Sequence, residues 1–287
     1  MSPQIEDLDR MLRDVPAMPV VAQKVMHMLG DSRTTNVQLG ETLASDQSLA
    51  SRILQMANSP FFGTRKKISS ISGAVFVLGH SALRSLIITA CTKGLFKNPG
   101  LMEEKLWEHS LGSAIAAREI ATACNRMDPD DAFIAGLLHD IGKPIFVSAY
   151  PVEYRAIFTK VYESNLTMDE NIALEKEEFG YDHCEVGSRV LTAWRLPTMY
   201  ARAARRHHTD NLQLISGDDN PEVLAVVAQA NRIAMRVGLG RPEPDKRVDV
   251  IETNANVYLN LNREKVLQIV EKTLKTYKEA RDQFNLT

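Results

Sequence analysis

The sequence of 287 residues holds only three cysteines, and none of them belongs to a CxxC pair. Cys91, Cys124 and Cys184 are an odd number and lie far apart in the chain. Neither a disulfide framework nor a thiolate zinc site is therefore indicated. Free thiols suggest a reducing compartment, and we expect a cytoplasmic protein.

Signals for export and for membrane insertion are also lacking. The first twelve residues, MSPQIEDLDRML, have neither the basic start nor the long apolar core of a secretory signal. No apolar run approaches the length needed to span a bilayer. We therefore expect neither export nor insertion.

Neither positive nor negative charge is in large excess, because the formal net charge is only -2. A strongly basic chain would be attracted as a whole to nucleic acid or to anionic membranes, and this one would not. Local basic patches are still compatible with this composition. With 44% hydrophobic and 24% charged residues, the chain has the composition of a soluble globular protein of one large or two small domains.

Strand patterns bounded by tight turns are hard to find, whereas helix start signals recur, and we predict an all-α fold. In DQSLASRILQMAN, Asp46 is a candidate N-cap, and Leu49, Ile53 and Met56 fall on one helical face. The segment MDPDDAFIAGLLHD places Asp128 as N-cap and Pro129 at the first helical position. Further starts are predicted at Thr167, Asp182 and Asn220.

The least regular segments are residues 58–70 and 238–249, and the second is the better candidate for a linker. After it, residues 262–284 have the pattern of a C-terminal amphipathic helix. This helix could dock on the rest of the chain or mediate dimerisation, and the sequence leaves both open. We find no internal repeat, low-complexity tract or sustained heptad.

Histidines are the residues that indicate chemistry. His139 and Asp140 are adjacent and follow an apolar run, and they pair an imidazole nitrogen with a carboxylate, which suits a divalent metal. The other candidate ligands are too far apart in the chain for a local metal motif and could meet only through the fold. The full set of candidate metal ligands is His109, His139, Asp140, His183, His207 and His208.

Four cations are candidates for binding a phosphate beside such a metal: Lys143, Arg202, Arg205 and Arg206. The arginines could equally form a solvated face paired with nearby acids. A His-Asp cluster could likewise hold helix ends together by hydrogen bonds without any metal.

Several long motifs then occur in one order: WEHS from Trp107, GLLHDIGK from Gly136, FGYDHCEVGSRVLTAWRLP from Phe179, and HH at His207. With VPAMPVVAQKVMHML, LASDQSLASRILQMANSPFFG and ISSISGAVFVLGHSALRSLI before them, they resemble the HDOD domain, a bacterial relative of the HD phosphohydrolases. The resemblance covers roughly residues 10–235.

This resemblance implies an N-terminal helical subdomain packed on an HD-like helical bundle. We accordingly expect an N-terminal helical part over residues 1–100, an HD-like bundle over 101–240, and a loop with the C-terminal helix over 241–287. It also implies a regulatory or output role in bacterial signal transduction, for which a defined enzymatic activity is not a general property.

Compared with active HD enzymes, His109 matches the first ligand, His139 and Asp140 the defining pair, and His183, His207 and His208 the additional histidines of HD-GYP relatives. Two positions depart from that pattern. Asn231 stands where the closing aspartate is expected, and its neutral amide lowers the predicted metal affinity. Lys105 stands where HD-GYP members can carry a glutamate, which disfavours a third metal. The GYP signature itself is absent from the sequence.

These observations favour a non-catalytic signalling module that acts through a protein partner or a ligand, with a degenerate site for iron, manganese or zinc. The alternative is a metal-dependent phosphohydrolase acting on a nucleotide or cyclic dinucleotide, in which Asp140 and Lys143 would take part in the reaction. Nucleotide binding without turnover is a third hypothesis. A candidate partner surface is SPFFGTRKK, although Phe61 and Phe62 could instead fill a domain junction.

Overall fold

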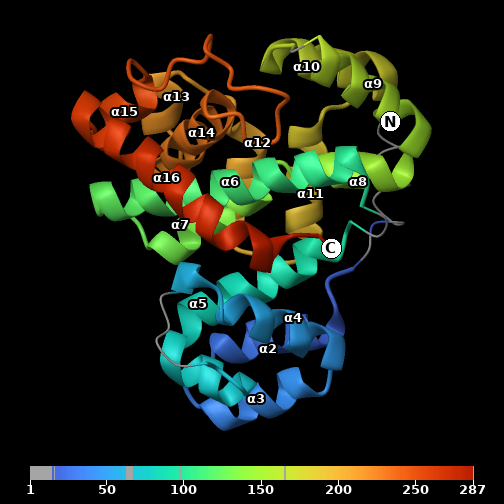
Figure 1. The fold of residues 1–287 in the computed structure, drawn as a ribbon, viewed down its shortest axis with the longest axis vertical. Coiled ribbons are helices and arrows are strands. Elements are labelled where there is room, and N and C mark those ends of the chain that lie inside the picture. Colours follow the sequence, from blue (N-terminus) through green and yellow to red (C-terminus); the bar gives the residue numbers. More distant parts are fainter. Residues whose placement is uncertain (1–14, 16, 63–66, 97–98, 165, 287) are drawn as a thin grey trace. The chain divides into compact units, whose positions relative to one another are not determined.

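The structure, a computed structural model, describes residues 15, 17–62, 67–96, 99–164 and 166–286. Within these ranges the chain forms helices that are joined by turns and loops, and it forms no strand (Figure 1). The predicted all-α fold is therefore confirmed.

The chain divides into two compact units. We call Leu95–Leu274 the bundle unit, and Ala17–Gly94 together with Lys275–Thr287 the N-terminal unit. The division between the units falls after Gly94, and residues 241–287 contribute to both units. The domain boundaries expected at residues 100 and 240 stay predictions.

The N-terminal unit begins its helices as the sequence predicts. Asp46 caps α4 (Gln47–Ala57) by accepting a hydrogen bond from the Leu49 amide at 3.0 Å. Leu49, Ile53 and Met56 are all buried. The predicted N-cap and apolar face are thus confirmed. In its described residues the unit contains α2 (Val20–Leu29), α3 (Asn36–Ala44), α4 (Gln47–Ala57), η1 (Pro60–Phe62) and α5 (Ile71–Lys93).

Phe61 and Phe62, from the proposed partner surface, are half-buried. Their ring centroids lie 5.0 Å apart, and Phe61 also contacts Phe284 at 5.9 Å. These contacts lie within the N-terminal unit, and they leave less of the surface of the two rings exposed to a partner protein. Lys67 is exposed, whereas Arg65 and Lys66 lie outside the described residues.

The bundle unit carries the histidines. Its helices are α6 (Leu101–Cys124), α7 (Pro129–Leu138), α8 (Gly142–Ala149), α9 (Pro151–Glu163), α10 (Met168–Phe179), α11 (His183–Ala193), α12 (Thr198–Arg206), α13 (Leu212–Ser216), α14 (Pro221–Arg236), α15 (Asn254–Leu259) and α16 (Arg263–Phe284), the last of which ends in the N-terminal unit.

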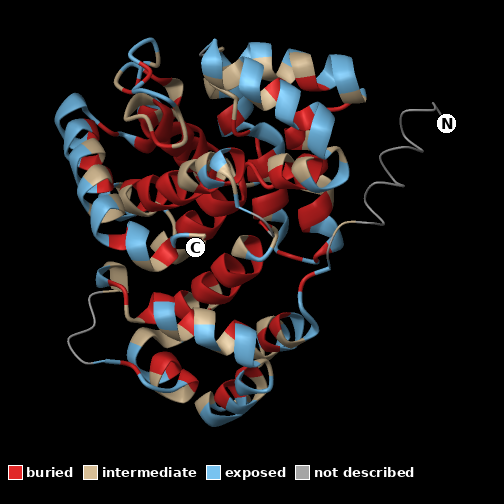
Figure 2. Ribbon diagram, turned by 45° about the vertical axis from the view of Figure 1, so that its right-hand side comes forward, coloured by how far each residue is buried: buried red, intermediate tan, exposed pale blue. Residues whose placement is uncertain are grey.

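Small side chains let the central helices of this unit approach closely. A Cβ atom on Gly136 of α7 would lie 2.6 Å from the Ser113 carbonyl oxygen of α6, so this contact requires glycine. Alanines such as Ala117 and Ala230 are fully buried in the core of this unit, where α6 packs against α7 and α14. Figure 2 shows much of this interior in red, the colour of buried residues. The small residues of α6 are therefore used for helix packing.

Helix α16 matches the predicted C-terminal helix. Val266 and Ile269 are buried in the core of the bundle unit, and Phe284 is buried at the far end of the helix. These contacts favour docking, the first of its two predicted roles. Leu267 is half-exposed on the same helix.

Two helical segments are long and apolar enough to cross a membrane, contrary to the prediction from the sequence. They are Ile71–Lys93 and Pro129–Ala149, and 61% and 78% of their most apolar windows are buried inside the protein. Such burial is typical of core helices, which pass the same test of length and composition.

Candidate metal centre

Five imidazoles and one carboxylate converge in the bundle unit. His109 comes from α6, His139 and Asp140 from the turn between α7 and α8, and His183 from the first residue of α11. His207 and His208 directly follow α12. The fold thus brings together all six candidate ligands predicted from the sequence.

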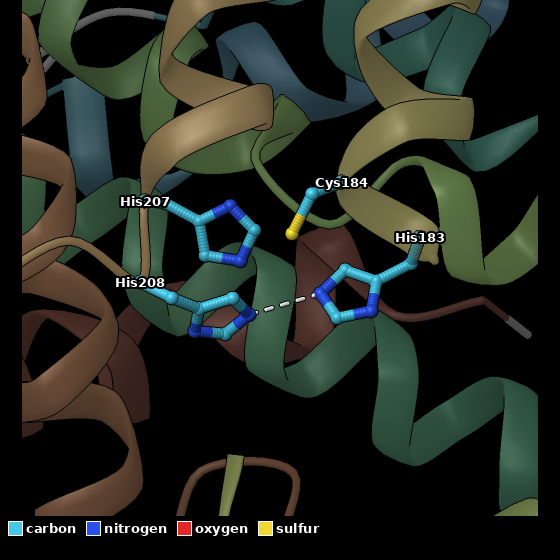
Figure 3. A group of neighbouring side chains, drawn as sticks. All are labelled: His183, Cys184, His207 and His208. Carbon is cyan, nitrogen blue, oxygen red and sulfur yellow. Dashed lines mark hydrogen bonds between the residues drawn. The ribbon is translucent and has the colours of Figure 1, made fainter. Parts of the chain in front are cut away.

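The Asp140 carboxylate lies at the centre of this cluster. Its Oδ2 atom is 3.6 Å from His109 Nε2 and 3.4 Å from His139 Nε2. Its Oδ1 atom is 3.3 Å from both His183 Nε2 and His207 Nε2. The same Nε2 atom of His183 also lies 3.0 Å from the Nε2 atom of His208 (Figure 3). The carboxylate therefore faces four of the five histidines.

Local sequence signals place these helix ends. Asp128 accepts hydrogen bonds from the amides of Asp130 and Asp131 at the start of α7. Asp182 accepts one from the Glu185 amide and so starts α11 at His183. A Cβ atom on Gly142 would lie 2.0 Å from the His183 carbonyl oxygen. Only glycine permits this approach, which brings His183 to Asp140.

The imidazole rings are fixed through their Nδ1 atoms. The Nδ1 atoms of His139 and His207 lie 2.7 and 2.9 Å from the carbonyl oxygens of Gly136 and Ala204. A carbonyl oxygen can only accept, so each Nδ1 carries the hydrogen and each neutral ring leaves its Nε2 lone pair free. In metal sites, ligating histidines are oriented by the same kind of hydrogen bond.

Three polar atoms of the cluster have no hydrogen-bond donor among the described residues. They are His139 Nε2, His207 Nε2 and Asp140 Oδ1, and all three are buried. Their lone pairs point into one small space, where they would repel one another unless a proton or a cation lies between them. A divalent ion with imidazole and carboxylate ligands satisfies all three, so these residues fit a metal.

The pKa values agree with neutral ligands at several positions. Burial lowers the pKa of His109 to about 4, and it lowers the pKa of His139 well below its usual value. Burial alone would raise the pKa of Asp140, but Lys143 and His139 outweigh it and hold that pKa well below its usual value. An ionised carboxylate beside neutral imidazoles is the state that binds a metal.

Glu175 is a functional residue that the sequence did not reveal. It is completely buried, and its Oε2 atom accepts hydrogen bonds from the His183 amide at 2.8 Å and from His183 Nδ1 at 2.6 Å. Tyr154 donates to its Oε1 atom at 3.2 Å. Burial by itself would lower the pKa of His183, but Cys184 and Glu175 outweigh it and raise that pKa well above its usual value.

Cys184 is the second residue that was missed. Its sulfur belongs to a group with His183, His207 and His208 in which all ligand atoms lie within 4.8 Å of one another. The absence of a CxxC pair argued against a thiolate site, but the fold brings this cysteine to histidines that are distant in the chain. A second group comprises His109, His139 and Asp140.

A cavity of about 90 Å³ lies beside the cluster and is lined in part by His109, Asp140 and His208. Because one water molecule needs about 10–15 Å³, the cavity has room for several water molecules or a small anion. The cations that line it are Lys105, Lys143 and Arg241, and the aromatic residues of α9 that line it are Tyr154, Phe158 and Tyr162.

Comparison with protein families identifies the chain. A model of the HDOD domain matches residues 15–210, which is more than half of the sequence. The chain belongs to the HDOD family.

Two solved structures and one curated relative are similar to this chain. An HDOD domain protein of unknown function from Geobacter sulfurreducens is 28% identical, with a TM-score of 0.68 and coverage of 94% of this chain and 90% of that one. A proposed phosphohydrolase from Shewanella amazonensis SB2B is 21% identical, with a TM-score of 0.67 and coverage of 96% and 98%. An uncharacterized protein of Treponema pallidum (strain Nichols) is 27% identical over 222 residues. The match covers 76% of this chain but only 42% of that curated relative.

Asn231 lies in the HDOD site at the place predicted for the closing residue. Its Oδ1 atom is 3.0 Å from His109 Nε2, and the residue lines the cavity. The amide is neutral, so Asp140 is the only carboxylate among the residues predicted to hold a metal. Lys105, the other departure, lines the same cavity and donates a hydrogen bond to Glu108 at 2.7 Å.

The four candidate phosphate-binding cations of this HDOD protein lie in different places. Lys143 lines the cavity, and its Nζ atom is 2.5 Å from Asp140 Oδ2. Arg202 and Arg206 pair with Asp218 at 2.8 and 3.1 Å. Arg205 lies 3.6 Å from Glu185. None of the three arginines is among the described residues that line the cavity, so the alternative of a face paired with acids fits them better.

Proposed function

We propose that this HDOD protein is a regulatory module of bacterial signal transduction that acts by binding a protein partner or a ligand, without catalysis. Its pocket holds a divalent transition metal in a degenerate HD-type site. We place the protein in the cytoplasm, since most of both apolar helical windows is buried and the three cysteines are free thiols. The net charge of -2 gives no support for binding to nucleic acid or membranes.

The contact between Asn231 and His109 carries the proposal. At 3.0 Å from His109 Nε2, the amide occupies the position where a carboxylate would add negative charge to the site. The remaining carboxylate, Asp140, is already 2.5 Å from the ammonium group of Lys143. A site with so little negative charge holds a hard divalent ion weakly, which suits regulated occupancy better than turnover.

Iron, manganese and zinc are the metals we consider. Imidazole is a borderline ligand that suits iron and zinc, whereas a carboxylate also suits manganese. The unpaired Nε2 atoms of His139 and His207 support a bound cation of this group.

The cavity supports an anionic small molecule as the ligand. Lys105, Lys143 and Arg241 line it together with aromatic residues of α9. The cavity has room for a phosphate group, which the cations suit, and the aromatic faces suit the base of a nucleotide whose phosphate is bound there. Arg202, Arg205 and Arg206 are omitted from this site because they pair with acids elsewhere.

Metal-dependent phosphohydrolysis is the second candidate function. The convergent lone pairs of His139, His207 and Asp140 favour it, since a metal held there would lower the pKa of a bound water. Lys143 would then stabilise the charge on a phosphate.

Turnover decides between the two functions. Protein loaded separately with Fe²⁺, Mn²⁺ and Zn²⁺ is incubated with nucleotides, cyclic dinucleotides and bis(4-nitrophenyl) phosphate. We expect no hydrolysis above that of Asp140→Ala with any metal. Hydrolysis by the wild-type protein that is lost in Asp140→Ala would establish the phosphohydrolase instead.

Calorimetry with the same nucleotide panel tests ligand binding. We expect a saturable heat that weakens in Lys143→Ala, because this substitution removes a cation from the cavity wall. Lys160→Ala is the matched control, since Lys160 is exposed on α9 and does not line the described cavity. Equal affinities in the two variants would rule out this pocket as the binding site.

A further inference from the structure

Cys184 lies among three of the histidines, although no residue pattern in the sequence connects them. Figure 3 shows its sulfur pointing between the rings of His183 and His207, with His208 beside them. Each of the four residues offers one ligand atom, and these atoms all lie within 4.8 Å of one another. Imidazole nitrogen and thiolate sulfur are the ligand types that tetrahedral zinc prefers, and here four such atoms come together.

The spacing of these atoms is close to that of a bound ion. With zinc bonds of about 2.0 Å to nitrogen and about 2.3 Å to sulfur, tetrahedral ligand atoms lie roughly 3.3–3.6 Å apart. The Nε2 atoms of His183 and His208 are 3.0 Å apart. Since all four ligand atoms lie within 4.8 Å of one another, the widest separation exceeds the spacing around zinc by at most about 1.2 Å.

The histidines of the group are held in the orientation that such an ion needs. His183 Nδ1 is bound by the buried Glu175 carboxylate at 2.6 Å, and His207 Nδ1 by the Ala204 carbonyl oxygen at 2.9 Å. Both rings thus direct Nε2 into the group. The Nε2 atom of His207 is buried and has no hydrogen-bond partner among the described residues, which points to a ligand between these side chains independently of the cysteine.

We propose that His183, Cys184, His207 and His208 form a closed zinc site in which Cys184 is a thiolate ligand. On binding, the Cys184 thiol loses its proton to solvent and the sulfur forms a bond to the ion. The thiolate supplies a negative charge to a pocket in which Asn231 is neutral. It also selects zinc over hard ions such as Mg²⁺ and Ca²⁺, which prefer oxygen ligands.

Four protein ligands leave no open position on a tetrahedral ion, so this zinc is structural or regulatory rather than hydrolytic. The neighbouring group is different, because His109, His139 and Asp140 offer three ligand atoms and leave positions open. Asp140 Oδ1 lies 3.3 Å from both His183 and His207, so its carboxylate connects the two groups. In this arrangement the Nε2 lone pair of His207 belongs to the closed zinc site, and the adjacent open site consists of His109, His139 and Asp140.

Cobalt(II) spectroscopy of the full chain tests this assignment, which rests on the proposed function only in that both place a metal in the pocket. Cobalt(II) replaces zinc in tetrahedral sites, and a thiolate ligand gives it an intense charge-transfer band in the near ultraviolet. We expect this band in the wild-type protein and in Cys124→Ser, and its loss in Cys184→Ser. Cys124 is a matched control because it lies in the same unit outside the histidine group.

Zinc X-ray absorption on the wild-type protein gives a second readout that does not depend on a variant folding. We expect a sulfur neighbour at about 2.3 Å from the zinc. Cobalt bound without a charge-transfer band, or zinc surrounded only by nitrogen and oxygen, would overturn the thiolate ligand. A protein that takes up neither metal would overturn the whole site.

These outcomes are separate from those of the turnover assay. Hydrolysis in that assay would overturn the non-catalytic function, while the charge-transfer band would still decide whether Cys184 is a ligand. Conversely, absence of the charge-transfer band from the cobalt-loaded wild-type protein would not contradict the non-catalytic function.

Discussion

The Nε2 atom of His109 on α6 lies 3.0 Å from the Oδ1 atom of Asn231 on α14. The Nδ1 atom of the same ring lies 3.2 Å from the Leu239 carbonyl oxygen. Both oxygens are acceptors, so a neutral His109 ring donates its single N–H to one of them and has a lone pair on its other nitrogen. The packing of α6 on α14 places an amide where a carboxylate would complete a metal site. This relationship leads to the first prediction.

Asn231→Asp should strengthen the binding of Mn²⁺ or Fe²⁺ by about tenfold or more, because it adds a negative charge of similar shape beside His109. Metal titration followed by calorimetry measures the change. Asn171→Asp adds the same charge to the cavity wall and serves as control. Equal gains in the two variants would mean that Asn231 has no special position.

Asp140→Asn should remove the metal, because the carboxylate oxygens face four histidines within 3.6 Å. Elemental mass spectrometry on protein purified without chelators should find about one or more equivalents of metal in the wild-type protein and far less in the variant. Asp130→Asn, at the start of α7, is the control. Retention of metal in Asp140→Asn would show that the ion binds elsewhere.

Glu175→Ala should destabilise the protein by about 2–4 kcal/mol, because it leaves two donors of His183 and the Tyr154 hydroxyl without their buried acceptor. Glu175→Gln keeps the shape and should have a smaller effect. Urea unfolding measures both. Glu177→Gln, exposed on the same helix, should leave stability nearly unchanged, and a similar loss there would contradict a special role for Glu175.

Gly142→Ala should reduce stability by about 3 kcal/mol, because its Cβ atom would lie 2.0 Å from the His183 carbonyl oxygen. Displacement of α11 should also weaken metal uptake, since His183 would leave the cluster. Gly30→Ala is the control, because its Cβ atom would only make an ordinary contact at 3.4 Å. Normal stability and metal content in Gly142→Ala would show that the helices tolerate a wider approach.

The metal-free protein should lose stability as the pH falls from about 6.5 towards 4. Burial holds the pKa of folded His109 at about 4, whereas the unfolded chain takes up this proton near 6.5. Protons therefore bind the unfolded state first, and His109 contributes stability that is present above 6.5 and lost below it. Between pH 7 and about pH 5 this loss amounts to about 2 kcal/mol.

Urea unfolding in the presence of a chelator measures the free energy of unfolding at pH 7 and at about pH 5. Between these pH values, His109→Gln should lose about 2 kcal/mol less of this free energy than the wild-type protein. His27→Gln, at an exposed site in the N-terminal unit, is the control. An identical pH dependence in the wild-type protein and His109→Gln would exclude this contribution.

Much of the architecture could be predicted from local sequence. Side-chain caps at Asp46, Asp128 and Asp182 begin helices where expected, because a cap depends on residues within one turn of each other. The motifs around His139 and His207 also predicted the family correctly.

Other parts of the site depend on residues that meet only after folding. Glu175 looks like one more acid in LEKEEF, and only its burial between Tyr154 and His183 reveals its role. The three candidate arginines have the right charge for a phosphate, but the turn after α13 gives two of them Asp218 as a partner. The spacing of residues along the sequence reveals neither the burial of Glu175 nor the pairing of two arginines with Asp218.

The sequence by itself determined that the chain is helical, where most of its helices begin, and which histidines are candidates for a metal, because these properties depend on neighbouring residues and on composition. Only the tertiary structure decided that Asp140 faces four imidazoles, that Asn231 lies beside His109 and that Cys184 lies among His183, His207 and His208. Those positions follow from how closely the helices pack, and at Gly136 and Gly142 the packing has no room for even one additional methyl group.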